Sequence, residues 1–195
     1  MRSEERLRIA QDLHDDIGAR LLTLMYQAPT PEIEEYIRHT IQDLKTLTRG
    51  LAAHTHCLSQ AAGEWKRDIS HRLNVARCEL DWHMNLDRDV GLNVVQWSAL
   101  TRILRELVSN TISHAHARTV SVRLALTEGT LRLSVSDDGE GQAPQAWSHG
   151  LGLGGVRKRV KQLGGSVHWS AQSPQGICCE VEVPNFAGSC PIERP

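Results

Sequence analysis

The spacing of apolar side chains changes once along this 195-residue chain, and the change divides it into two parts. Up to about residue 51, apolar residues recur every three or four positions, which is the period of a helix that buries one face. The stretch APTP (28–31) interrupts this pattern, because proline disfavours helical geometry at the residue before it. The first part is therefore predicted to be an antiparallel hairpin of two helices, over residues 3–28 and from about 31 to 51.

A hairpin of two amphipathic helices cannot enclose a hydrophobic core by itself. The usual remedy is association with a second hairpin, which forms a four-helix bundle. We therefore expect residues 1–53 to be a dimerisation element and the protein to be a homodimer.

Beyond a linker-like stretch at 54–60 the pattern becomes a mixture of helices and strands. We expect helices near 61–76, 93–116 and 153–163, and strands near 78–84, 119–126, 130–136, 165–171 and 177–184. The predicted fold class is α+β, with a domain over 61–185 and a tail over 186–195.

The composition excludes several classes of function. A formal net charge of −1 provides no overall field for nucleic acid or an anionic membrane. The chain has no apolar run near the roughly 18 residues that span a membrane, and its start lacks the apolar core of a signal peptide. We expect a cytoplasmic location, no direct nucleic-acid partner, and free thiols at all five cysteines.

The stretch GLGLGG (150–155) formally matches a dinucleotide fingerprint, but no strand precedes it and no acidic residue follows at the required distance. What remains is a loop that leads into a helix. Free N–H groups at that helix start would face an anion, with Arg157 close by. The alternative is an ordinary glycine-rich surface loop.

Two stretches upstream favour a nucleotide site. In DDGEG (137–141), Asp137 ends a strand and could accept a hydrogen bond from the amine of a base, while Gly139 and Gly141 would let the backbone approach the ring. The alternative is a simple Asp-Gly turn. Glu106 and Asn110 lie one helical turn apart, where their oxygens could hold Mg²⁺. The alternative for this pair is a solvated helix face.

Together and in this order, the three stretches resemble the ATP-binding domain shared by histidine kinases, Hsp90-type chaperones and DNA gyrase. Glu106-x-x-x-Asn110 matches the asparagine box of that family, Asp137-x-Gly139-x-Gly141 its first glycine box, and Gly150-x-Gly152 its second. The resemblance implies a two-layer α/β sandwich that binds ATP and Mg²⁺. It implies that Asp137 recognises adenine, that Asn110 holds the metal with Glu106 nearby, and that Gly150 and Gly152 cradle the phosphates.

The opening stretch ERLRIAQDLHDDIGARL then looks like the phosphoacceptor helix of sensor histidine kinases, in the branch of the nitrate/nitrite sensors. By this resemblance His14 accepts the γ-phosphoryl group of ATP and passes it to an aspartate on a response-regulator receiver domain. Asp15 would accept the N–H of the histidine ring and orient it. Contact with a membrane would come only through a sensor region upstream. This branch often carries Gln where this chain has Ala19, so we expect phosphatase activity that is weak or that uses another residue.

Other interpretations of these residues stay open. Glu106 could activate water, as in an ATPase of the chaperone or gyrase kind, or the chain could be a scaffold that binds nucleotide and transfers nothing. Asp12, His14 and Asp16 could bind a metal ion but lack a fourth ligand, and the HTHC stretch (54–57) lacks a matching pair for zinc.

Overall fold

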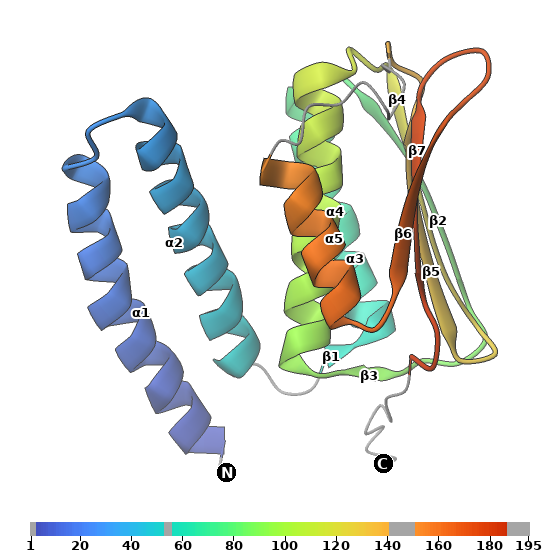
Figure 1. Ribbon diagram of the computed structural model, residues 1–195. Helices are drawn as coiled ribbons and strands as arrows, with labels where there is room; N and C mark the ends of the chain where they lie inside the picture. Colours follow the sequence, from blue (N-terminus) through green and yellow to red (C-terminus); the bar gives the residue numbers. More distant parts are fainter. Residues whose placement is uncertain (1–2, 53–55, 141–150, 187–195) are drawn as a thin grey trace. The chain divides into compact units, whose positions relative to one another are not determined.

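The computed structural model describes residues 3–52, 56–140 and 151–186, and the chain divides into two compact units, Met1–His56 and Cys57–Pro195. The first unit contains helices α1 (Ser3–Tyr26) and α2 (Pro31–Ala52), which pack against each other (Figure 1). Glu32 and Glu34 in the first turn of α2 suit the positive end of its dipole. Several large apolar side chains of this hairpin are exposed, namely Leu22, Leu24, Ile33 and Tyr36.

The second unit is built on a five-stranded mixed sheet with the strand order β2-β4-β5-β7-β6. Its strands are β2 (Glu79–Leu86), β4 (Thr119–Thr127), β5 (Thr130–Asp137), β6 (Ser166–Ala171) and β7 (Ile177–Val183). The β2–β4 pair is parallel, and the other neighbours are antiparallel. A separate two-stranded sheet joins β1 (His56–Cys57) to β3 (Gly91–Leu92).

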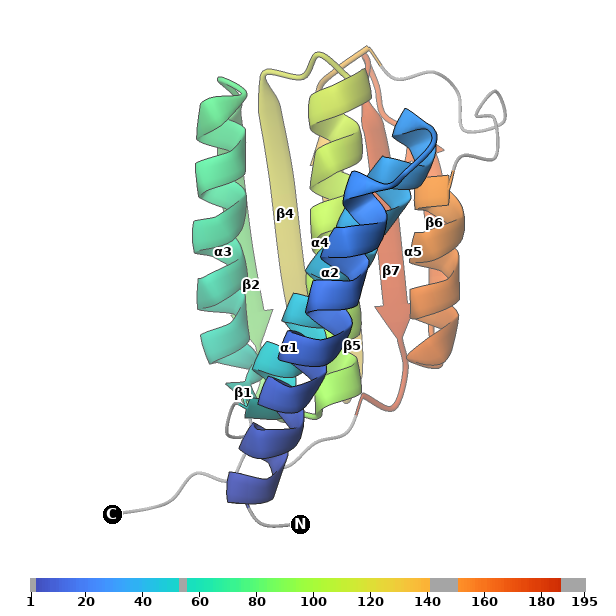
Figure 2. The same ribbon diagram turned by 90° about the vertical axis from the view of Figure 1, so that its left-hand side faces the viewer.

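Helices α3 (Leu58–Val75), α4 (Val94–His114) and α5 (Leu151–Gln162) lie on one face of the sheet, as Figures 1 and 2 show. The alternation of side chains along β4 explains this arrangement, because Val120, Val122, Leu124 and Leu126 are buried while the residues between them are not. The predicted α+β class and two-layer sandwich are confirmed.

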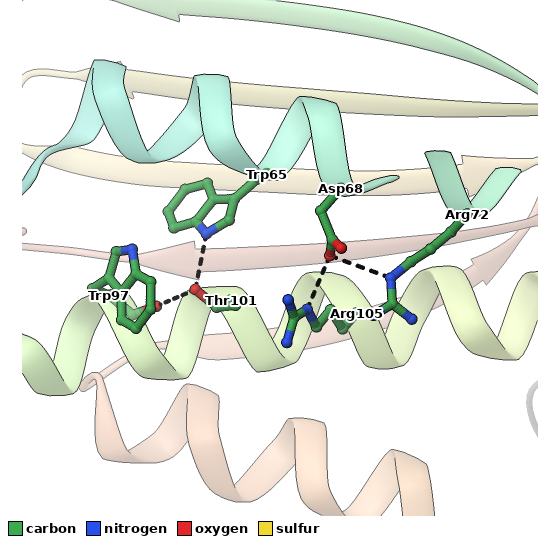
Figure 3. Close-up of polar contacts among 6 residues, drawn as sticks. All are labelled: Trp65, Asp68, Arg72, Trp97, Thr101 and Arg105. Atoms are coloured by element: carbon green, nitrogen blue, oxygen red, sulfur yellow. Dashed lines mark hydrogen bonds and ion pairs between the residues drawn. The ribbon is translucent and has the colours of Figure 1, made fainter. Parts of the chain in front are cut away.

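Polar contacts join α3 to α4 beside the apolar core (Figure 3). The indole N–H of Trp65 donates to Thr101 Oγ1 at 2.8 Å, and that hydroxyl donates to the carbonyl of Trp97 at 2.7 Å. The carboxylate of Asp68 accepts from Arg105 Nε at 2.9 Å and from Arg72 Nε at 3.2 Å. These contacts satisfy polar groups at the helix interface and fix how α4 sits against α3.

The structure differs from the sequence-based expectation at three points. Helix α3 begins at Leu58, inside the expected linker, because Leu58 is fully buried and its N–H donates to the Val90 carbonyl at 2.8 Å. The strands β1 and β3 were not expected, since two residues are too few to show a period. Cys78, Cys178 and Cys179 are free thiols, but Cys57 is disulfide-bonded, so the expectation of five free thiols is wrong. Every helix in the described part of the chain is either too short or too polar to span a membrane.

Candidate nucleotide site

Asp137 is the last residue of β5 and is only 8% exposed. The alternation of β5 points its side chain to the core side of the sheet, towards the last turns of α4. Gly139 N–H donates to Asp137 Oδ1 at 3.0 Å, and Thr111 Oγ1 of α4 lies 3.5 Å from Asp137 Oδ2. The sequence therefore placed Asp137 correctly at a strand end, but it offered no sign that Thr111 would contact it.

The environment of Asp137 is a compromise between burial and hydrogen bonding. Burial raises the pKa of this carboxyl, and the amides of Gly139 and Ile177 and the hydroxyl of Thr111 oppose the rise. A buried carboxyl with few donors retains unused acceptor capacity. Such a group is suited to accept a hydrogen bond from an amine that enters the site.

Two glycines allow the backbone to close around Asp137. A Cβ on Gly139 would lie 2.2 Å from the carbonyl oxygen of Ala115, which also accepts from the N–H of Glu140 at 2.7 Å. A Cβ on Gly176 would lie 1.9 Å from the carbonyl oxygen of Asp137, and Gly176 has a φ of +108°. Gly139 was among the predicted site residues. Gly176 was expected only as part of a turn, because its proximity to Asp137 depends on β7 pairing with β5.

Asp138 has the opposite environment to Asp137. Its side chain is exposed, and its Oδ1 accepts from the N–H groups of Arg118 at 2.8 Å and Thr119 at 2.9 Å. These bonds, led by the one from Thr119, lower the pKa of Asp138. Two adjacent acids are therefore held in different ways, one buried with spare acceptor capacity and one engaged with backbone amides.

Glu106 and Asn110 lie on α4, one turn apart as predicted, and both are half-buried. Within the described part of the chain, neither side chain has a hydrogen-bond or ion-pair partner. A carboxylate and an amide oxygen without partners match the ligands that Mg²⁺ prefers, provided that water and phosphate oxygens complete its shell. The residues thus fit the metal that the motif implies.

The second glycine stretch is only partly described. Gly141 and Gly150 lie outside the described residues, and Gly152 is in the first turn of α5. Arg157, which we expected near phosphates, is exposed, and its guanidinium carbon lies 4.9 Å from the centre of the Trp169 ring on β6. This cation–π contact joins α5 to the sheet and was not predicted from the sequence.

His14 lies in the middle of α1, and Asp12, Asp15 and Ala19 are exposed on the same helix. Asp16 forms an ion pair with Arg20 at 3.1 Å, one turn away. Among the described residues there is no group of three or more histidine, cysteine or acidic side chains that could hold a metal ion. His54, the first residue of the HTHC stretch, lies outside the described residues.

Comparison with known proteins places residues 96–186 in the family described as histidine kinase-, DNA gyrase B- and HSP90-like ATPase. The chain is 29% identical to the sensor histidine kinase YxjM of Bacillus subtilis over 93% of its length and 48% of the relative. It is 26% identical to the sensor histidine kinase LiaS of the same organism, with 94% and 55% covered. A third relative is the kinase/phosphatase UhpB of Salmonella typhimurium, at 27% identity over 86% of this chain and 37% of UhpB. The chain spans about half the length of the first two relatives.

Solved structures show the same fold. The histidine kinase domain of the blue-light activated kinase from Erythrobacter litoralis matches with a TM-score of 0.64 at 19% identity, covering 93% of each chain. The catalytic domain of the histidine kinase ThkA matches with a TM-score of 0.52 at 17% identity, covering 68% of this chain and 98% of ThkA's. The motifs around Asn110 and Asp137, the two-layer sandwich and these relatives agree: residues 96–186 match the histidine kinase-, DNA gyrase B- and HSP90-like ATPase family, and the chain is similar to sensor histidine kinases.

Proposed function

We propose that this protein uses ATP and Mg²⁺ to phosphorylate its own His14 and then transfers the phosphoryl group to an aspartate of a response-regulator receiver domain. The observation that carries the proposal is the buried carboxylate of Asp137 at the end of β5, enclosed by backbone that only glycine permits at Gly139 and Gly176. The relatives, which are named as sensor histidine kinases, support the same activity.

In this proposal Asp137 recognises adenine. Its carboxylate accepts a hydrogen bond from the exocyclic amine, and the ring lies against the backbone at Gly139 and Gly141. Guanine carries an oxygen acceptor at the position of that amine, so a carboxylate there repels it. ATP is therefore the preferred nucleotide over GTP.

Asn110 and Glu106 hold Mg²⁺ directly or through water, and the metal neutralises charge on the phosphates when bound. Gly150 and Gly152 bring backbone N–H groups at the start of α5 towards the phosphate oxygens. Arg157 already contacts Trp169, so its part in this proposal is to keep α5 seated on the sheet while contributing positive charge.

A ring nitrogen of His14 attacks the γ-phosphorus, and the bond from that phosphorus to the bridging oxygen of ADP breaks, with the electron pair leaving on ADP. Asp15 accepts the N–H of the other ring nitrogen, which fixes the tautomer and stabilises the positive charge that develops. The phosphoryl group then moves to the receiver aspartate and leaves the imidazole neutral. We also propose that the exposed apolar side chains of α1 and α2 meet a second copy in a homodimer.

The test is incubation of the full chain with γ-labelled ATP and Mg²⁺, followed by treatment of the labelled protein with acid. We expect a label that acid removes, because phosphohistidine is unstable in acid, and we expect none in His14→Gln. The matched control is His71→Gln, the same substitution at an exposed histidine of α3. Steady ATP hydrolysis without label would instead support an ATPase in which Glu106 activates water. ATP binding with neither hydrolysis nor labelling of the protein would support a scaffold.

A further inference from the structure

The carboxylate of Asp138 connects the end of β5, which carries Asp137, to the start of β4. Its Oδ1 accepts two hydrogen bonds from consecutive amides, those of Arg118 and Thr119, at 2.8 and 2.9 Å. Both belong to the segment that opens β4, whereas Asp138 directly follows β5. The backbone N–H of Asp138 also donates to the Thr119 carbonyl at 3.3 Å, so this link is made from both main chain and side chain.

A third segment meets the same residue. The side-chain amide of Gln175, in the turn before β7, donates to the Asp138 carbonyl at 2.9 Å. Asp138 therefore has contacts with the start of β4, the end of β5 and the start of β7. Strand alternation turns the Asp137 and Asp138 side chains in opposite directions, so these contacts do not occupy the buried carboxylate next to them.

The segment after Asp138 has no room to adjust by itself. Gly139 is pressed against the Ala115 carbonyl, and Glu140 N–H donates to that carbonyl at 2.7 Å. Pairing with β4 and β7 holds the body of β5, and the two side-chain bonds of Asp138 tie the residue beyond it to the start of β4. Without them, that link rests on the bond from the Asp138 N–H to the Thr119 carbonyl, at 3.3 Å. The direction in which Asp137 presents its carboxylate would then vary.

We propose that Asp138 is a positioning residue for nucleotide binding, which acts by fixing the end of β5 so that Asp137 faces the base. The inference rests on the proposed function of Asp137. The low pKa of Asp138, caused mainly by the Thr119 amide, agrees with it, since the contacts are made by the ionised carboxylate.

The experiment compares Asp138→Ala and Asp138→Asn with a matched control at the other end of β4. There Asp87 Oδ2 accepts from the Glu128 amide at 2.8 Å, so Asp87→Ala removes a similar exposed contact between a carboxylate and the backbone, away from the site. For each full-length variant, ATP binding with Mg²⁺, the KM for ATP, the rate of His14 labelling at saturating ATP and the thermal midpoint are measured.

We expect Asp138→Ala to raise the Kd and KM for ATP roughly tenfold, the scale of one charge-assisted hydrogen bond, with the saturating rate within about twofold. Asp138→Asn keeps an acceptor oxygen, and we expect a loss of roughly threefold, as for a neutral bond in place of a charged one. Asp87→Ala is expected to lower the thermal midpoint but not the affinity. If the alanine variant does not fold, the ATP affinity of Asp138→Asn tests the proposal by itself.

Wild-type affinity in the Asp138 variants, or an equal loss in Asp87→Ala, would overturn the inference. The proposed function is tested separately by wild type and Asp137→Asn. If wild type binds ATP and Asp137→Asn does not, only the role of Asp138 is in question. If wild type does not bind ATP, both proposals fail.

Discussion

At the scale of single residues, two adjacent acids at one strand end have opposite pKa shifts because their surroundings differ. Asp137 is buried, and burial is the main reason why its pKa is raised. Asp138 is exposed, and its pKa is lowered by backbone amides. Asp138 therefore contributes stability that is present above its unfolded pKa and is lost as the pH falls through its folded pKa. For Asp137 the favourable contribution is present below its unfolded pKa and is lost as the pH rises through its folded pKa.

We predict that Asp137→Asn stabilises the fold at pH 7 while it impairs ATP binding. An asparagine can still accept from Gly139 N–H, and its NH₂ can donate to Thr111, whose hydroxyl donates to the Leu107 carbonyl at 3.2 Å. The buried charge is removed while the partners Gly139 and Thr111 are kept, so the gain is on the order of 1 kcal/mol. An NH₂ in place of the acceptor oxygen faces the adenine amine, and the affinity falls about tenfold or more.

Chemical denaturation at pH 7 and pH 4 checks the first part of this prediction, and ATP titration checks the second. The stability gain is expected to shrink at pH 4, because wild-type Asp137 is then increasingly protonated. A variant that is less stable than wild type at pH 7 would show that the carboxylate is required for folding.

At the scale of elements, local sequence patterns predict the helices and strands, but they do not predict which residues from other elements contact Asp137. Glu106 and Asn110 could be placed on one helix face from their spacing, and Asp137 could be placed at a strand end from the alternation before it. Thr111 and Gly176 could not be predicted as site residues, because they reach Asp137 only through the packing of α4 and the pairing of β7 with β5. Leu58 was missed as the helix start because the residues around it are polar, whereas its backbone N–H bonds to the carbonyl of Val90, which is far away in the sequence.

Helix α3 contains a glycine, Gly63, whose replacement by alanine is expected to stabilise the fold. Gly63 is exposed in the helix, and a Cβ there meets nothing within 4 Å. We predict that Gly63→Ala raises the free energy of unfolding by about 0.5–1 kcal/mol, because alanine loses less backbone entropy in a helix. Equilibrium unfolding in urea measures the change.

The same substitution at Gly164 is the control. A Cβ at Gly164 also meets nothing within 4 Å, but its φ is +75°, which disfavours any L side chain. Gly164→Ala is therefore expected to destabilise by about 1 kcal/mol. Equal effects at the two positions would mean that backbone conformation does not control either change.

At the scale of the whole molecule, the chain consists of two compact units that divide the proposed reaction between them. The proposed phosphoacceptor is on α1, and the proposed nucleotide site is built from α4, β5 and β7. The two-layer sandwich of the second unit could be predicted from the sequence, since its helices and strands have distinct hydrophobic periods. How the units approach each other during transfer has no local signature in the sequence.

We predict that residues 57–195 alone bind ATP within about twofold of the full chain, because separate compact units contribute nearly independently. This fragment lacks His14 and is expected to take no label from γ-labelled ATP. Addition of residues 1–56 as a separate fragment is expected to restore some acid-labile label on the smaller piece. Loss of ATP binding in residues 57–195 would show instead that the hairpin is needed to complete the nucleotide site.

The sheet face opposite α3, α4 and α5 bears polar side chains that are already matched across or along the strands. Arg132 on β5 pairs with Glu182 on β7 at 3.1 Å, and Asp81 on β2 contacts both His83 at 2.9 Å and Ser121 at 3.0 Å. Such a surface gains little by stacking on another sheet, since doing so would strip water from paired charges without burying apolar area. The consequence concerns solubility: in the proposed homodimer, two ATPase units at high local concentration would not adhere to each other through their sheets.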